Sequence, residues 1–254
     1  MKARRTFVMA DIHGMHRALV QCLEGVNFDK ERDTLIQLGD VADRGPEVYE
    51  CIEELLTIKN RICIKGNHDE WLQNWMEKGV HPGMHQGGRE SIESYLRNCK
   101  RVEGVDYMND TGLDIPETHK KFLREQLPYY IDKDLNIFIH GGFNRHKLLA
   151  DNEPGIFWWD RDLWHCALSY ESMQRGLEYK DPSTGNRATL KIKEPCKEIF
   201  IGHTPTVMWG KGVPMKAANV INLDTGAGMY GKLTIMNLET REFFQSSLVT
   251  TLYP

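Results

Sequence analysis

An α/β fold is predicted by three features of this 254-residue sequence. Short apolar segments alternate with helix-like segments over the first 70 residues, which is the order of a sheet covered by helices. Several apolar segments are followed at once by glycine together with Asp, Asn or His, as where ligand-binding loops leave such a sheet. The composition, 41% hydrophobic and 27% charged, is that of a globular protein with a packed core.

The first 70 residues are predicted to form a strand, a helix, a strand, a helix and a strand, in that order. Strands are expected at Thr6–Ala10, Thr34–Leu38 and Arg61–Lys65, because each is a short apolar run. Residues 16–26 and 47–58 lie between them and repeat apolar side chains at helical spacing. This βαβαβ order predicts neighbouring strands with helices packed over them.

Residues 71–127 differ from the rest of the chain. They are polar and helix-rich, and His81-Pro82-Gly83 and Gly87-Gly88 interrupt them. No strand pattern returns before Tyr129. We predict a helical insertion here, within a single domain that spans residues 1–254.

The second half of the chain returns to strand patterns. They are expected at Leu135–Ile139, Glu198–Ile201, Asn219–Leu223 and Lys232–Met236. The polar, turn-rich stretch Tyr179–Ala188 predicts a loop between two of them.

Charge and cysteine content exclude several classes of protein. The 36 acidic and 32 basic residues give a net charge of −4, so no basic field favours nucleic acid or an anionic membrane. The six cysteines include no C-x-x-C pair, which argues against a disulfide scaffold and a thiolate zinc site. Cys22 and Cys51 are expected to pack as small apolar side chains. The basic N-terminus lacks the apolar core of a signal peptide, so a cytoplasmic protein is expected.

Polar side chains follow five of the predicted strands directly. The carboxyl ends of neighbouring strands in an open α/β sheet form the crevice where ligands bind. Metal-binding residue types therefore gather at one edge of the sheet. The segments are Asp11-Ile12-His13-Gly14, Gly39-Asp40-Val41-Ala42-Asp43-Arg44-Gly45, Gly66-Asn67-His68-Asp69, His140-Gly141-Gly142 and Gly202-His203-Thr204.

The types of ligand indicate which metals would bind. Carboxylate, imidazole and amide oxygen without thiolate suit Mn²⁺, Fe or Zn²⁺ better than Ca²⁺ or an iron–sulfur cluster. Six ligands are too many for one catalytic metal with an open position, but fit two metals that share a carboxylate. The remaining histidines lie outside these segments. His81 and His85 have helical metal-pair spacing, but Pro82 and Gly83 separate them, which predicts surface histidines instead.

The motifs DIHG, GDVADRG, GNHD, HGG and GHT, in this order from residue 11 to 204, resemble a known family. They are similar to the metal-dependent phosphoprotein phosphatases of the calcineurin-like metallophosphoesterase superfamily, above all to small bacterial and phage serine/threonine phosphatases. The later segment NVINLDTGAGMYGKLTIMNL looks like the closing strands of those enzymes. The resemblance implies a central β-sandwich flanked by helices.

The resemblance also implies a role for each motif residue. His68 would be the general acid on the leaving oxygen, and Asp43 would orient it. Arg44 would bind the phosphate oxygens, and Arg161 is the best match to the family's second phosphate-binding arginine. The alternative for residues 157–164 is an aromatic core segment with an exposed Arg161. The metal ligands would be Asp11 and His13 for the first ion, Asp40 as the bridge, and Asn67, His140 and His203 for the second.

The activity implied is that of a metal-dependent phosphomonoesterase, a serine/threonine protein phosphatase. A hydroxide bridging two divalent metals would attack the phosphoester directly, with Mn²⁺ expected and Fe or Zn²⁺ as alternatives. The partner would be a phosphorylated protein or a small phosphoester, with no nucleic acid and no membrane. The sequence does not indicate an oligomeric state.

Two other functions stay open at this point. Symmetric dinucleoside tetraphosphate hydrolases resemble the chain in the DxHG and GNHD regions, but typically have a VARG-like segment where this chain has Asp43. Asp43 therefore favours the phosphatase. A non-catalytic scaffold would be expected to have lost metal ligands, and none of the six is missing.

Overall fold

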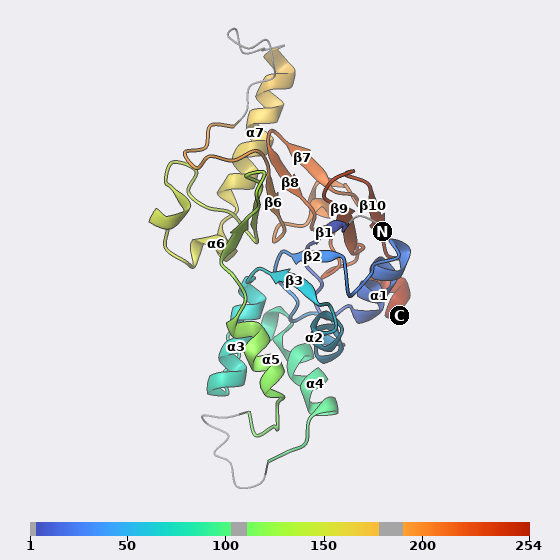
Figure 1. Ribbon diagram of the computed structural model, residues 1–254. Helices are drawn as coiled ribbons and strands as arrows, with labels where there is room; N and C mark the ends of the chain where they lie inside the picture. The colour runs from blue at the N-terminus through green and yellow to red at the C-terminus, as the bar shows by residue number, and fades with distance from the viewer. Residues whose placement is uncertain (1–3, 103–110, 178–189) are drawn as a thin grey trace.

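Two five-stranded sheets form the centre of the protein (Figure 1). The computed structural model describes residues 4–102, 111–177 and 190–254. The first sheet has the order β10 (Phe243–Gln245), β9 (Thr234–Asn237), β1 (Thr6–Met9), β2 (Thr34–Gln37), β3 (Asn60–Cys63). The second has the order β4 (Tyr129–Ile131), β5 (Ile137–Ile139), β6 (Ile199–Ile201), β8 (Val220–Asn222), β7 (Met215–Ala217).

Each sheet contains three adjacent parallel strands. In the first sheet β1 is parallel to β2 and β2 to β3, while β9 and β10 run antiparallel. In the second, β5 is parallel to β6 and β6 to β8, while β4 and β7 are antiparallel edges. Loops that leave the carboxyl ends of parallel strands emerge at the same edge of a sheet, so each sheet can supply several loops to one site.

The two sheets pack face to face, and alternation along each strand decides which side chains lie between them. In β1, Val8 packs in the layer between the sheets, whereas Phe7 and Met9 pack under the helices. The same layer holds Phe138 of β5 and Phe200 of β6, whose rings stack 5.0 Å apart. This confirms the predicted α/β fold with a central β-sandwich flanked by helices.

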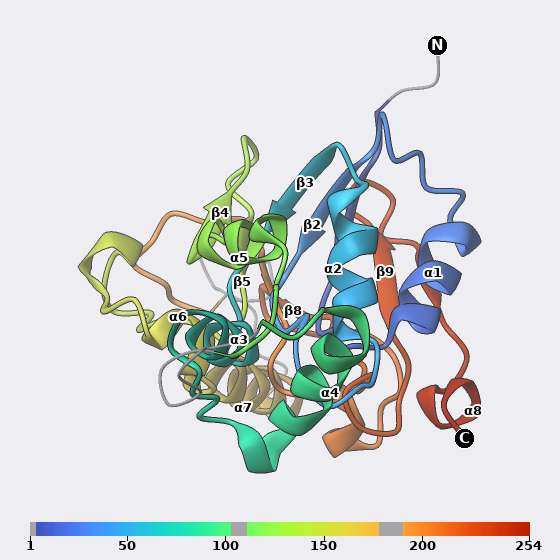
Figure 2. The same ribbon diagram turned by 90° about the horizontal axis from the view of Figure 1, so that it is seen from below.

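Helices cover the outer faces of both sheets. Figure 2 shows α1 (His16–Gly25) and α2 (Val48–Leu56) side by side over the first sheet, where Cys22 and Cys51 are fully buried. The second sheet is covered by α6 (Ile156–Trp159) and α7 (Asp162–Leu177). The short α8 (Val249–Leu252) packs on α1.

In its described residues the segment 71–127 is mostly helical, with isolated β-bridges from Arg101 to Leu113 and from Leu127 to Ile64. It contains most of α3 (Asn67–Lys78), the 3₁₀ turn η1 (Met84–Gln86), α4 (Gly88–Asn98) and α5 (Glu117–Arg124). These helices gather at one end of the molecule and pack on α2 and on one another (Figure 1). Two further 3₁₀ turns are η2 (Leu149–Asp151) and η3 (Thr206–Trp209).

The predicted strands and helices of the first 70 residues are found within a few residues of their expected bounds. The edge strands β7 and β10 are not predicted, because each has three residues and a largely solvent-accessible pattern without an apolar run. The predicted loop Tyr179–Ala188 lies outside the described residues. Across the described ranges, no helix combines the length and apolar character needed to cross a bilayer.

Candidate metal centre

The six predicted metal ligands converge from both sheets. Asp11 and His13 follow β1, Asp40 follows β2, and Asn67 opens α3 directly after the loop from β3. His140 follows β5 and His203 follows β6 in the second sheet. Each is at most 6% exposed. Burying so many polar groups together is unfavourable unless they pair with one another or hold a metal.

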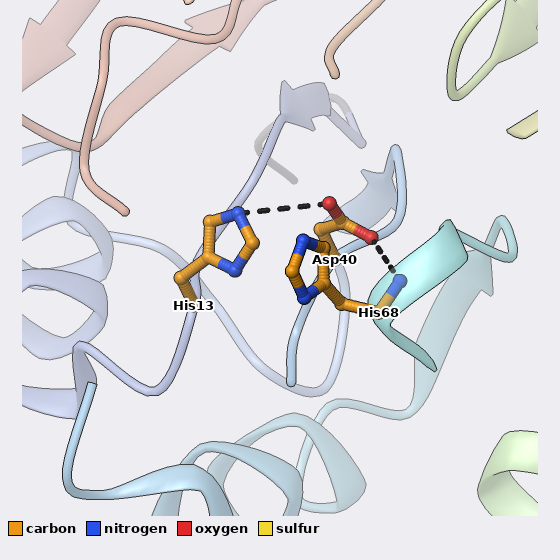
Figure 3. Close-up of side chains that lie close together, drawn as sticks. All are labelled: His13, Asp40 and His68. Atoms are coloured by element: carbon orange, nitrogen blue, oxygen red, sulfur yellow. Dashed lines mark hydrogen bonds and ion pairs between the residues drawn. The ribbon is translucent and has the colours of Figure 1, made fainter. Parts of the chain in front are cut away.

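Asp40 lies at the centre of this group. Its Oδ2 atom is 3.6 Å from His13 Nε2 and 3.3 Å from His140 Nε2. Two clusters of metal-ligating atoms therefore share it, His13–Asp40–His68 and Asp40–His140–His203. Figure 3 shows one oxygen of the Asp40 carboxylate facing the His13 ring, while the other, Oδ1, accepts the backbone N–H of His68.

The hydrogen bonds of the histidines fit a metal. The Nδ1 atom of His13 donates to the carbonyl of Ala42 and that of His140 to the carbonyl of Leu38, each at 2.8 Å. Donation from Nδ1 leaves Nε2 of the neutral imidazole, on the side that faces Asp40, to bind a metal, which is the usual arrangement in metal sites. In addition, His203 Nε2 is buried without a hydrogen-bond partner among the described residues.

The electrostatics of the centre are consistent with metal binding. Burial lowers the pKa of His13 to about 3 and that of His203 to about 2, so both are neutral, as a ligand must be. Burial also lowers the pKa of His140, but the Asp40 and Asp11 carboxylates outweigh it and raise the pKa to about 9. A metal would take the place of this proton, so metal binding at His140 should release one.

His68 and Asp43 form a buried pair beside the ligands. His68 Nδ1 donates to Asp43 Oδ2 at 2.7 Å, and the two side chains are at most 3% exposed. The imidazole is held edge-on between the rings of His13 and Trp71, at centroid distances of 4.8 and 4.7 Å. Its orientation is thus set on three sides.

Two arginines stand next to the ligand histidines. Arg44 donates from Nη1 to the carbonyl of Gly228 at 3.3 Å. Gly228 lies against His13, because a Cβ added to it would be 2.2 Å from the ring. Arg161 donates to the carbonyl of His203 at 3.3 Å. Both guanidinium groups therefore lie at the rim of the centre.

The aromatic segment around Arg161 has two parts. Phe157, Trp158 and Trp164 are buried, so this stretch does contribute an aromatic core. Trp159, in contrast, is 44% exposed, and its ring lies 6.2 Å from that of His203. The segment thus contributes to the aromatic core and also places Arg161 and Trp159 beside His203, so the two interpretations do not exclude each other.

A sequence profile of the calcineurin-like phosphoesterase family matches residues 4–207. The chain belongs to this family. It is therefore a metallophosphoesterase, a hydrolase whose fold implies a dinuclear metal centre, and the clusters around Asp40 supply candidate ligands.

Relatives of this phosphoesterase have a more specific name. The symmetrical bis(5'-nucleosyl)-tetraphosphatase of Proteus mirabilis (strain HI4320) is 38% identical, over 97% of this chain and 99% of the relative. The enzyme of the same name from Coxiella burnetii (strain RSA 493 / Nine Mile phase I) is 35% identical, over 95% and 91%.

Solved structures share the fold at lower identity. A candidate diadenosine tetraphosphatase is 14% identical with a TM-score of 0.62, and the match covers 95% of this chain and 92% of the other. The cold-active protein-tyrosine phosphatase of a psychrophile Shewanella species is 16% identical with a TM-score of 0.53, over 97% and 81%. These likenesses show the fold of the phosphoesterase.

Backbone strain is concentrated in the centre of this phosphoesterase. Five non-glycine residues in or near the two clusters of metal-ligating atoms have left-handed backbone angles, at φ values from 48° to 69°. Such conformations cost about 1–3 kcal/mol each and persist where surrounding contacts enforce them. The residues are His13, Asp40, Asp43, Arg44 and His203.

Asp69, to which the sequence assigned no role, supplies some of that enforcement. Its buried carboxylate accepts the backbone N–H groups of the loop that holds Asp40. The donors are the N–H groups of Asp40 at 2.9 Å, Val41 at 2.9 Å, Ala42 at 3.2 Å and Gly66 at 3.1 Å, with Gln126 Nε2 at 2.9 Å. The available signal is an acidic residue at the third position of a helix that follows glycine.

We predict that Asp69→Asn lowers the free energy of unfolding by about 2–4 kcal/mol and weakens metal retention. An amide has one acceptor oxygen and would place its own N–H groups against the loop donors. Urea unfolding and metal analysis of the purified variant would measure both effects. The matched control is Glu77→Gln, an acid-to-amide change on the exposed side of the same helix. Equal stability of the two variants would contradict the prediction.

One histidine, His81, is buried although the sequence predicts it at the surface. His81, expected at the surface, is 5% exposed, and its Nε2 lies 3.0 Å from Asp43 Oδ1. The expectation was wrong because α3 already ends at Lys78, before Gly79, and the turn that follows packs His81 inward against Gly88, the first residue of α4. His85 is exposed, as expected.

Proposed function

We propose that this phosphoesterase hydrolyses dinucleoside tetraphosphates symmetrically, giving two nucleoside diphosphates. The observation that carries the proposal is the similarity to symmetrical bis(5'-nucleosyl)-tetraphosphatases, up to 38% identity over nearly the whole of both chains. This corresponds to the alternative left open by the sequence, and it is favoured over the serine/threonine phosphatase.

The proposed centre assigns the buried ligands to two divalent metals. Asp11 and His13 would hold the first, and Asn67, His140 and His203 the second. Asp40 would bridge them, since both clusters share its carboxylate. When bound, the two ions supply an activated water and neutralise charge on the phosphoryl group. Mn²⁺ is the first metal to test, with Fe and Zn²⁺ as alternatives.

The other side chains have separate tasks in this proposal. Arg44 and Arg161, at the rim, would bind phosphate oxygens and counter their negative charge. His68 would donate a proton from Nε2 to the leaving oxygen as the P–O bond breaks, while Asp43 holds Nδ1. These roles are supported by the hydrogen bonds of His68 and by the position of each arginine next to a candidate ligand histidine.

Trp159 is a candidate surface for a nucleobase. It is exposed beside His203, and base–aromatic stacking contributes about 1–3 kcal/mol in proteins that bind nucleotides. We predict that Trp159→Ala raises KM for diadenosine tetraphosphate about 10-fold and leaves kcat nearly unchanged, because the ring would bind the base and not the reacting phosphate.

Steady-state kinetics with diadenosine tetraphosphate would measure both constants. The control is Phe243→Ala, which removes a similarly exposed ring from an edge strand of the first sheet. An unchanged KM for the dinucleotide would remove Trp159 from the proposed site.

A phosphomonoesterase acting on phosphoserine or phosphothreonine is the second candidate, and the His68–Asp43 pair favours it. A serine alkoxide is a strong base and needs a proton to leave. A nucleoside diphosphate leaves through a phosphate oxygen, a much weaker base, and needs that proton less. An acid held as firmly as His68 is therefore more useful for a monoester.

The deciding experiment is parallel hydrolysis of diadenosine tetraphosphate and a phosphoserine peptide by the Mn²⁺-loaded protein, with chelator as control. The expected result is chelator-sensitive hydrolysis of the dinucleotide to ADP, with no phosphate released from the peptide. Release of phosphate from the peptide alone would replace the proposal with the second candidate. Turnover of neither would reject both.

A further inference from the structure

The carboxylate of Asp43 is held by donors from three different places in the chain. Its Oδ2 accepts only from His68 among the described residues, at 2.7 Å. Its Oδ1 accepts from His81 Nε2 at 3.0 Å and from the hydroxyl of Ser91 at 2.6 Å. Ser91 Oγ also accepts the backbone N–H of Asp43 at 2.9 Å. All four side chains are at most 5% exposed.

We propose that His81 and Ser91 are positioning residues that hold Asp43, and through it His68, in the orientation needed for proton transfer to the leaving group. The inference rests on the general-acid role proposed for His68. Its effect should be largest for substrates with a basic leaving group, such as a phosphomonoester.

Geometry gives the two donors this task. A carboxylate with one unpartnered oxygen could rotate about its Cβ–Cγ bond and turn the imidazole bound to the other oxygen. Two donors on Oδ1 oppose that rotation and leave Oδ2 to His68. Asp43 is acceptor-only when ionised, so the His81 nitrogen that faces it carries the proton.

The donors belong to the helical segment 71–127. His81 precedes η1, and Ser91 lies in the first turn of α4. The turn between them also contacts the loop that carries Asp43, since the N–H of Arg44 donates to the carbonyl of Gly87 at 3.0 Å. Gly88 packs on His81 so closely that a Cβ there would lie 2.3 Å from His81 Nδ1. The helical segment thus holds Asp43, the hydrogen-bond partner of the proposed acid His68, in place.

The test compares two variants of equal polarity, His81→Asn and His81→Gln. Glutamine can place an N–H donor where His81 Nε2 lies, whereas asparagine is too short to reach Asp43. Each is assayed on phenyl phosphate, whose leaving phenolate has a pKa of about 10, and on 4-nitrophenyl phosphate, whose leaving group needs little help from an acid. Ser91→Ala is a second, smaller perturbation of the same oxygen.

The expected result is a loss that depends on the leaving group. His81→Asn should lower kcat on phenyl phosphate about 10-fold with KM and metal content unchanged, and change kcat on 4-nitrophenyl phosphate less than about 2-fold. His81→Gln should restore most of the loss. In a His68→Asn background, His81→Asn should have no further effect, because it acts through the missing imidazole. His85→Asn, an exposed histidine of the same turn, is the control.

Other outcomes separate this inference from the role of His68. Equal losses of kcat on both aryl phosphates, or a loss that persists in the His68→Asn background, would show that His81 stabilises the fold and does not position Asp43. If neither His81→Asn nor Ser91→Ala changes kcat, the positioning role is refuted. If His68→Asn itself shows no dependence on the leaving group, the general-acid proposal fails, whatever His81 does.

Discussion

Replacing Asp40 with asparagine should abolish hydrolysis and remove at least one of two bound metals. Asp40 is the one residue shared by both clusters of ligand atoms among the described residues, and its Oδ2 lies within 3.6 Å of two ligand histidines. An amide cannot bridge two cations through charged oxygens. The metals are worth several kcal/mol of transition-state stabilisation, so the expected loss of kcat is roughly 10³-fold or more.

The measurement pairs turnover with elemental analysis of the purified, metal-loaded protein. Asp134→Asn makes the same chemical change on an exposed loop and should keep both metals and full activity. If Asp40→Asn retains most of the turnover, the two-metal proposal is wrong. Loss of turnover with both metals retained would move Asp40 from the role of bridge to another role in catalysis.

His68→Asn should lower kcat by about 10²-fold on phenyl phosphate while both metals remain bound. The imidazole is held by Asp43, His13 and Trp71, and asparagine cannot deliver a proton to the leaving oxygen. On 4-nitrophenyl phosphate the loss should be much smaller, since that leaving group departs without a proton.

Metal content decides between two roles for this histidine. His68 lies close enough to His13 and Asp40 to share a metal with them. If His68→Asn loses one metal and its activity falls equally on both aryl phosphates, His68 is a ligand rather than the acid. Asn74→Ala, a half-buried polar position on the same helix, is the control for changes in α3 itself.

Short-range pattern was sufficient for the inner part of the fold. β1, β5 and β6 are buried on both faces, so each contains a continuous apolar run and was predictable. The edge strands β7 and β10 are partly exposed and only three residues long, and each pairs in a hairpin with the strand next to it along the chain, β8 or β9.

The candidate ligands were predictable for a related reason. Parallel strands with glycine-rich ends bring their loops to one edge, so spacing along the chain indicated proximity in space. His81 and Ser91 could not be found in this way. Each acts through a hydrogen bond to Asp43, 38 or 48 positions away, and no local pattern encodes such a bond.

By itself, the sequence determined the α/β class, the order of the inner strands and the set of residue types that can bind two metals. These follow from local periodicity and from the residues that end each strand. Through the family that they resemble, the motifs also implied Asp40 as the bridge between the two ligand sets. Only the tertiary structure decided the distances around Asp40 and the contacts of the helical segment with Asp43 through His81 and Ser91. The physical reason is that hydrogen bonds and ion pairs depend on distances of about 3 Å between atoms, and only the folded chain sets those distances.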